Sequence, residues 1–297
     1  MVYTTIAACR FAGNITFEKY RGELTVGGIA GRTDGSVNGC LNEGGITVEV
    51  TESGSVSGGG ITGDCNGKNI RITGCINRGK LSGNSTSYKT EGISLAGIVG
   101  TNFSGSTINN CLNEGEVNVR FSSSQTVYSP FSAAGITTSN YGLVINSGNT
   151  GRIAVQSDMK ATVGGISSHN SGSIVNSYNI GAIACNGRKG QTFYNNGGGI
   201  TGVFQYSTIG ITPLIYGCYN SGTVSSTGSE EQIGSIAGDA SYLIDKYNVP
   251  TRIRNTYYSA ETGKPIGNDY YQQSQYILGV FDMKGKDFRQ DLNEAAQ

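Results

Sequence analysis

The sequence contains no tryptophan, a single histidine and only four prolines in 297 residues. One histidine excludes a zinc site of the HExxH type, which needs two histidines four residues apart on a helix. Only 14% of the residues are charged, and 21 Lys and Arg balance 21 Asp and Glu, so no basic surface points to nucleic acid. Apolar runs are a few residues long, whereas a membrane span needs about 18. The composition therefore predicts neither nucleic-acid binding nor membrane insertion.

Glycine is abundant, with 47 residues, and it recurs in two alternating motifs. The first motif reads GGIAG, GGITG, AGIVG, AGITT, GGISS, GGITG and GSIAG, and successive copies lie 30–38 residues apart. Its central isoleucines are Ile29, Ile61, Ile98, Ile136, Ile166, Ile200 and Ile236. The second motif reads CLNEG, CINRG, CLNEG, SGNTG, SYNIG and CYNSG, beginning at Cys40, Cys75, Cys111, Ser147, Ser177 and Cys218. Such a period predicts stacked structural repeats.

Strands, rather than helices, fit the repeat units, because Gly, Ser, Thr, Asn and β-branched residues crowd them. Apolar residues also recur three positions before and six positions after each Cys-type residue, which predicts stacked rows that face inward. We therefore expect an all-β, right-handed parallel β-helix, or β-solenoid, of about seven coils. The array is expected over residues 1–258, and a C-terminal cap over residues 259–297, with a short helix that Asp287 caps and that packs Phe288 and Leu292.

Asparagine occupies one column of the second motif, and glycine follows it two residues later. The column contains Asn42, Asn77, Asn113, Asn149, Asn179 and Asn220. Stacked side-chain amides can hydrogen-bond from coil to coil, so we interpret this column as a structural ladder rather than a binding site. Copies four and five have Ser147 and Ser177 in place of Cys, and Gly148 interrupts the apolar position that follows. These two coils are expected to be less tightly packed.

The ordered recurrence of G-G-I-x-G and I-x-x-C-x-N-x-G-x-[IV] over residues 9–258 resembles the GLUG repeat of bacterial cell-surface proteins. GLUG repeats occur in adhesin-like surface proteins and in the non-catalytic region of some IgA-cleaving metallopeptidases. The segment from Asn255 to Gly267 and the segment from Asp282 to Asn293 look like the closing segment of such arrays. The resemblance implies an extracellular, cell-surface location. Because the chain opens within a repeat and has no signal-peptide core, we expect it to be a fragment of a longer surface-anchored protein.

Insertions between repeats are free to vary, so we expect any ligand-binding residues there. Three insertions, residues 82–94, 121–133 and 186–196, follow equivalent positions and should emerge on one side of the solenoid. Aromatic side chains with neighbouring Asn, Ser and Gln suit contact with a glycan or a protein, although they also suit packing against the flanks of the solenoid. The candidate ligand-binding residues are Tyr88, Tyr128, Phe131, Phe193, Tyr194, Phe204 and Tyr206.

Catalytic and metal chemistry finds little support in the sequence. His169 stands in a predicted turn with no carboxylate nearby, and Glu43 and Glu114 share a column with Arg78 between them, which indicates a surface charge row. The seven cysteines contain no CxxC motif and are interpreted as buried thiols, while the spacing leaves a disulfide such as Cys40 to Cys75 open. We expect no enzyme activity, no cofactor and no bound metal.

The sequence therefore predicts a non-catalytic cell-surface repeat domain, an adhesin module or stalk whose loops bind a host or bacterial surface protein or glycan. Two alternatives stay open. One is an auxiliary substrate-recognition domain of an IgA-cleaving metallopeptidase. The other is a polysaccharide-degrading β-helix enzyme, which would need two carboxylates about 5–9 Å apart.

Overall fold

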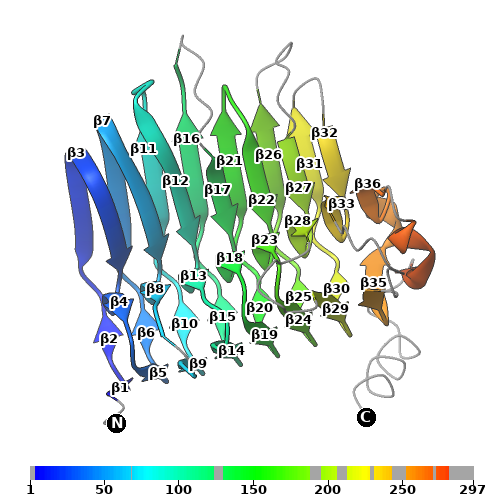
Figure 1. Ribbon diagram of the computed structural model, residues 1–297, viewed down its shortest axis with the longest axis horizontal. Helices are drawn as coiled ribbons and strands as arrows, with labels where there is room; N and C mark the ends of the chain where they lie inside the picture. The colour runs from blue at the N-terminus through cyan, green and yellow to red at the C-terminus, as the bar shows by residue number, and fades with distance from the viewer. Residues whose placement is uncertain are drawn as a thin grey trace.

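A computed structural model describes residues 4–67, 69–123, 130–187, 195–205, 213–227, 231–242, 252–269 and 272–280. The described chain is a parallel β-solenoid of about six turns. Six complete turns lie between the first and the last of the seven copies of the first motif, whereas the expectation of seven coils counts one coil for each copy. Successive coils lie side by side from the N-terminal to the C-terminal end of the molecule (Figure 1). No α-helix occurs in these ranges.

Two sheets of short strands form the base of the solenoid, and all their strands pair in parallel. Sheet A has the order β1 (Thr5–Ala7), β5 (Ser36–Asn38), β9 (Arg71–Thr73), β14 (Thr107–Asn109), β19 (Leu143–Ile145), β24 (Ser173–Val175), β29 (Leu214–Tyr216) and β34 (Ile253–Arg254). Sheet B has the order β2 (Arg10–Phe11), β6 (Leu41–Asn42), β10 (Ile76–Asn77), β15 (Leu112–Asn113), β20 (Gly148–Asn149), β25 (Tyr178–Asn179), β30 (Tyr219–Asn220), β35 (Thr256–Ser259) and β37 (Ile277–Val280).

Sheet C rises from this base and folds over itself. Its ascending strands are β11 (Leu81–Ser85), β16 (Val117–Phe121), β21 (Ile153–Ser157), β26 (Ile183–Gly187) and β31 (Val224–Thr227). Its descending strands are β12 (Thr90–Ala96), β17 (Phe131–Ala134), β22 (Ala161–Gly164), β27 (Asn195–Gly198) and β32 (Glu231–Gly234). In the first two coils a single long strand covers both parts, β3 (Asn14–Gly27) and β7 (Gly45–Gly59). These tall strands form the upper part of the molecule in Figure 1.

Sheet D closes each coil and returns the chain to sheet A. Its strands are β4 (Ala30–Thr33), β8 (Thr62–Cys65), β13 (Val99–Asn102), β18 (Thr137–Asn140), β23 (Ser167–Asn170), β28 (Thr201–Gln205), β33 (Ala237–Tyr242) and β36 (Ile266–Asn268). Two short 3-10 helices, η1 (Ala260–Thr262) and η2 (Gln273–Tyr276), lie near the C-terminal end. Because β36 and β37 pair with β33 and β35, the stack continues beyond the expected boundary at residue 258. The expected cap helix at Asp287 lies outside the described residues.

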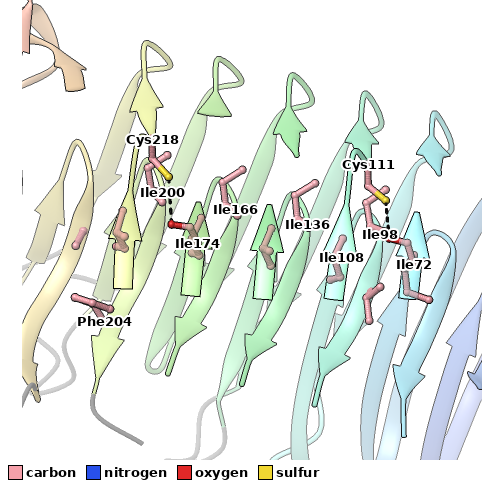
Figure 2. Close-up of a cluster of buried hydrophobic side chains, with 14 of the residues drawn as sticks. Ile72, Ile98, Ile108, Cys111, Ile136, Ile166, Ile174, Ile200, Phe204 and Cys218 are labelled. Atoms are coloured by element: carbon pink, nitrogen blue, oxygen red, sulfur yellow. Dashed lines mark hydrogen bonds between the residues drawn. The ribbon is translucent and has the colours of Figure 1, made fainter. Parts of the chain in front are cut away.

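The four sheets enclose two separate apolar cores. The upper core fills the narrow space between ascending and descending strands, and it includes Val48, Leu95 and Phe131. The lower core lies between sheets A, B and D, where the isoleucines of the first motif stack with those of sheet A, coil upon coil (Figure 2). Ile61, Ile98 and Ile136 are completely buried there. The rows of the sequence repeat are therefore rows of the core.

Candidate functional site: an aromatic stripe on the outer face

The asparagine column forms a continuous ladder. The Asn113 amide nitrogen donates to Asn149 Oδ1 at 2.7 Å and to the Gly115 carbonyl at 2.9 Å, while Asn77 donates to Asn113 Oδ1 at 2.8 Å. Equivalent side-chain bonds at 2.7 Å join Asn42 to Asn77 and Asn179 to Asn220. All six side chains are completely buried. The column therefore has a structural role and offers no surface to a ligand.

The two sequence motifs meet at this ladder. In the first six copies of the first motif, the glycine directly before the isoleucine packs against the asparagine of the same coil. A Cβ atom on Gly97 would lie 2.2 Å from Asn113 Cγ, and one on Gly60 would lie 2.4 Å from Asn77 Oδ1. No side chain fits at those distances, so glycine is required wherever the column has asparagine. In the last copy Ser235 replaces this glycine, and Tyr258 stands in register with Asn220.

The cysteine column needs a small hydrogen-bond donor and not a thiol in particular. Cys111 Sγ donates to the carbonyl of Asn109 at 3.4 Å, and the hydroxyls of Ser147 and Ser177 make the same bond two residues back, at 2.9 and 2.8 Å. Both serines are completely buried. The expectation that these coils pack less tightly is therefore wrong at this position, because the hydroxyl replaces the thiol. All seven cysteines are free thiols, with no bond between Cys40 and Cys75.

A second asparagine ladder was not foreseen from the sequence. Asn102 donates to Asn140 Oδ1 at 2.8 Å, and Asn140 donates to Asn170 Oδ1 at 2.7 Å. These residues end strands β13, β18 and β23 of sheet D. Their signal in the sequence is an asparagine four residues after the motif isoleucine in three successive copies, flanked by Cys65 and Phe204 at the same position.

The candidate aromatic residues of the insertions fall into three groups. Tyr88 is 50% exposed in the turn between β11 and β12, and Lys89 Nζ lies 5.6 Å from the centre of its ring. Phe131 and Phe204 are completely buried on β17 and β28, and Phe131 stacks on Phe121 with ring centres 4.2 Å apart. Their assignment as ligand-binding residues is therefore corrected, since both are core residues. The four others, Tyr128, Phe193, Tyr194 and Tyr206, lie outside the described residues.

Charged residues form rows on the N-terminal coils. Arg78 bonds Glu114 at 2.6 Å and lies 3.9 Å from Glu43, as expected of a surface charge row. In a parallel row, Glu116 binds Lys80 at 2.9 Å and Arg152 at 3.2 Å. The hydrogen bond from Lys80, with the positive charges of both partners, lowers the pKa of Glu116. These carboxylates are therefore held by cations.

A polar hollow of about 260 Å³ lies between the descending strands of sheet C and sheet D in the first four coils. Ser57, Arg32, Thr101 and Ser139 are among its lining residues. Asp64 is buried at its edge, where Ser57 donates to Asp64 Oδ1 at 2.8 Å and Arg32 lies 3.4 Å from Oδ2. This carboxylate is therefore oriented by two neighbours of its own chain.

His169 lies on strand β23 and not in the expected turn, in register with Ser139 and Val203. The side chain is half-buried. Burial, with a smaller contribution from the charge of Lys160, lowers the pKa of His169 to about 4. The imidazole is therefore neutral at physiological pH.

The most distinctive surface is on sheet B, directly after the cysteine column. In the outward row of this sheet, Leu41, Ile76 and Leu112 are followed by Gly148, Tyr178 and Tyr219. The rings of Tyr178 and Tyr219 stack with centres 5.4 Å apart and planes within 10°. Burial raises the pKa of Tyr219, and the neighbouring Tyr178 raises it further.

Glycine at position 148 makes room for this arrangement. A Cβ atom there would lie 2.2 Å from Tyr178 Cζ, so the Tyr178 ring lies over the backbone of the preceding coil. Gly148 therefore leaves no gap in the stack, although the sequence suggested one. Beside the rings, Ile180 is 48% exposed. On sheet A, the outward row next to this surface contains Ile145, Val175 and Tyr216, and Asn255 donates to the Tyr216 hydroxyl at 3.1 Å.

We call this surface the tyrosine stripe and define it by its outward side chains. Its members are Ile145, Val175, Tyr178, Ile180, Tyr216 and Tyr219. In the N-terminal coils the three rows of this surface contain Asn38, Thr73 and Asn109, then Leu41, Ile76 and Leu112, then Glu43, Arg78 and Glu114. Along the axis the polar row becomes apolar, the apolar row gains two tyrosines, and the charged row loses its charges, with Thr150, Ile180 and Ser221 in its later coils. The sequence signal of the stripe is the residue directly after each Cys-type position, which changes from Leu or Ile to Gly and then Tyr along the chain.

Among the described residues, no group of three or more His, Cys, Asp or Glu side chains could hold a metal ion. No helix in those ranges has the length and apolar character to cross a membrane. No protein-family model, curated protein or solved structure matches the chain. The molecule is therefore defined by its architecture, as a repeat protein of the parallel β-solenoid class.

Proposed function

We propose that this chain is a non-catalytic repeat module of a bacterial cell-surface protein, with GLUG-like repeats, that works as an adhesin module or stalk outside the cell. The observation that carries the proposal is the change of one outer face from charge rows to the tyrosine stripe. The asparagine ladder and the isoleucine rows run through both the N-terminal and the later coils, so the inward packing does not by itself demand this change. Ile180 is exposed and the other five members of the stripe are half-buried, and apolar side chains left partly open to solvent in this way are typical of binding sites.

The scaffold supports this role. The described coils hydrogen-bond to one another through four sheets, and the asparagine ladder joins the six coils from Asn42 to Asn220, so the outer rows are held at fixed spacing. The charge rows on the N-terminal coils support a non-catalytic role, because Glu43 and Glu114 both interact with Arg78. A hydrolase would need two carboxylates free to reach a substrate.

Adhesion of protein-coated beads tests the proposal. Beads carrying the purified chain are incubated with surfaces of mucin, immunoglobulin A and arrayed host and bacterial glycans, and retention under flow is measured. We expect specific retention on at least one surface, lost when Tyr178 and Tyr219 are both changed to Ser and kept with Tyr88→Ser. Retention equal to that of beads coated with the unfolded chain would overturn the proposal. Loss with Tyr88→Ser alone would move the binding surface to the β11–β12 turn.

A further inference from the structure

The cysteine column begins with an exposed thiol and continues into buried ones. Cys9 is exposed, whereas Cys40, Cys75 and Cys111 in the next three coils are buried. The Cys9 thiol donates to the Ala7 carbonyl at 3.5 Å, a bond that a serine hydroxyl makes at the equivalent position of two later coils. Packing therefore gives no reason for a thiol, rather than a hydroxyl, at this exposed position.

We propose that Cys9 and Cys40 form a disulfide-exchange site, at which a small-molecule disulfide such as oxidised glutathione converts the two thiols into a bond between the first and second coils. Two observations carry this proposal. One is the register and contact of the two cysteines, and the other is the difference in their exposure.

The backbone holds the two cysteines side by side in neighbouring coils. The strand pairs on either side, β1 with β5 and β2 with β6, share one register, which places Cys9 beside Cys40. The Cys9 backbone N–H donates to Cys40 Sγ at 3.4 Å. Neighbouring strands lie about 4.8 Å apart, within the range of about 4.4–6.8 Å that a disulfide allows between Cα atoms. The backbone spacing therefore permits a disulfide without a change of register.

Exposure sets the order of the two chemical steps. The Cys9 thiolate attacks one sulfur of the small-molecule disulfide, forms a mixed disulfide and releases the first small thiolate. The Cys40 thiolate then attacks Cys9 Sγ, which forms the bond between the coils and releases the second small thiolate. Two protein thiols are oxidised while one small-molecule disulfide is reduced to two thiols, which take up the two protons.

The second step is the slower one when the small-molecule disulfide is in excess. Burial raises the pKa of the Cys40 thiol, and the neighbouring thiols of Cys75 and Cys9 raise it further. Less of Cys40 is therefore present as the reactive thiolate at neutral pH. Its rate is set within the protein and does not depend on the concentration of the small molecule.

The bond fastens the coil that is least held by its neighbours. Among the described residues, β1, β2 and β4 stand at the ends of their sheets and pair on one side only. Residues 4–14 contain no buried side chain. Such a coil opens locally more easily than the interior of the stack, and a cross-link that closes one full turn restricts the opened states.

Ellman's reagent, itself an aromatic disulfide, tests the site on the whole chain at pH 8. We expect a fast release of a single equivalent of the coloured thiol from Cys9, then a slower second equivalent at a rate independent of reagent concentration. Mass spectrometry should find the product lighter than the reduced chain by two hydrogen atoms, with no bound reagent, and peptide mapping should link Cys9 to Cys40. A lasting reagent adduct on Cys9, or a bond between Cys40 and Cys75, would overturn the proposal.

Cys40→Ser is the decisive variant, because serine already occupies this column in two later coils and makes the same hydrogen bond. We expect it to fold, to release a single equivalent and to keep the reagent on Cys9. Cys75→Ser is the matched control and should keep the second phase. Loss of that phase with Cys75→Ser would overturn the proposal, since it would place the second reacting thiol one coil further in.

Amide hydrogen exchange after treatment with oxidised glutathione tests the effect on the first coil. Exchange in residues 4–17 should slow severalfold in the oxidised chain, return to its original rate on reduction, and not respond to the same treatment in Cys40→Ser. Exchange that is unchanged in the oxidised wild-type chain would refute the fastening of the first coil.

Discussion

Removing one asparagine side chain from the ladder should lower the free energy of unfolding far more than the small size of that side chain suggests. Asn113 donates two hydrogen bonds, to Asn149 Oδ1 and the Gly115 carbonyl, and accepts one from Asn77. Asn113→Ala leaves both acceptors without this donor in a fully buried corner. A buried polar group without a partner costs about 1–3 kcal/mol, so we expect a total loss of about 3–5 kcal/mol in the free energy of unfolding.

Urea denaturation followed by circular dichroism measures this loss. With a slope of about 3 kcal/mol per molar urea, the midpoint should fall by about 1 M or more. Asn118→Ala is the matched control, because Asn118 is half-buried on the outward side of β16 in the same coil. Such positions usually respond within about 0.5 kcal/mol. Equal midpoint shifts for Asn113→Ala and Asn118→Ala would refute the ladder as a stabilising element.

Asn113→Asp tests the direction in which the loss of stability at this position changes with pH. A carboxylate can accept from Asn77 but cannot donate to Asn149 Oδ1, so the folded state favours the protonated acid and raises its pKa above the unfolded value of about 3.9. Stability linked to a raised pKa is present at low pH and is lost as pH rises through the folded value. The deficit of this variant against the wild type should therefore be larger at pH 8 than at pH 4. A deficit independent of pH would contradict the reasoning.

Three further predictions follow from particular contacts. Gly97→Ala should prevent folding or lower the free energy of unfolding by at least about 3 kcal/mol, because its Cβ would lie 2.2 Å from Asn113 Cγ. The control is Gly39→Ala, where φ is +60° and nothing lies within 4 Å of the added Cβ; it should cost only about 1–2 kcal/mol. Similar melting curves for the two variants would contradict this prediction. Ellman's reagent at pH 8 should rapidly modify only Cys9, because this thiol is exposed and the other six are buried. Burial also raises the pKa of Cys218 to about 12. Fast reaction of several thiols would indicate an open core. The pKa of His169 is lowered to about 4 in the folded state, below the unfolded value of about 6.5, so its contribution to stability is present above about pH 6.5 and is lost as pH falls toward 4. His169→Gln should therefore reduce the fall of the urea midpoint on acidification. An unchanged pH profile would exclude this histidine as the source of the acid sensitivity.

Inward positions could be predicted from the sequence because a parallel stack repeats them. Ile98 and Ile136 have neighbours of their own kind above and below, so the repeat specifies both the strand and its facing. The ladder followed from the same logic, since an asparagine in every coil finds another at hydrogen-bond distance. The GLUG resemblance, by contrast, stays a prediction.

Insertions could not be predicted in this way because nothing in them repeats. Phe131 and Phe204 stood at the ends of insertions, where an aromatic residue is equally consistent with exposure and with packing. In the structure both belong to strands, and Phe131 fills the upper core against Phe121. The packing of Ser147 and Ser177 could not be predicted from side-chain volume, because their column selects a hydrogen-bond donor to the carbonyl two residues back.

The coupling of the two motifs explains why the outer rows are informative about function. Glycine at the second motif position and asparagine in the ladder restrict each other, and where one departs, as at Ser235, its partner departs too, as at Tyr258. The outward row of sheet B is not tied to the ladder, and its residue type varies, with Leu112, Gly148 and Tyr178 in successive coils. Within this row Tyr178 packs over Gly148 and stacks on Tyr219. The run of aromatic and aliphatic side chains in the later coils is therefore the part of the outer surface on which the proposed binding role rests.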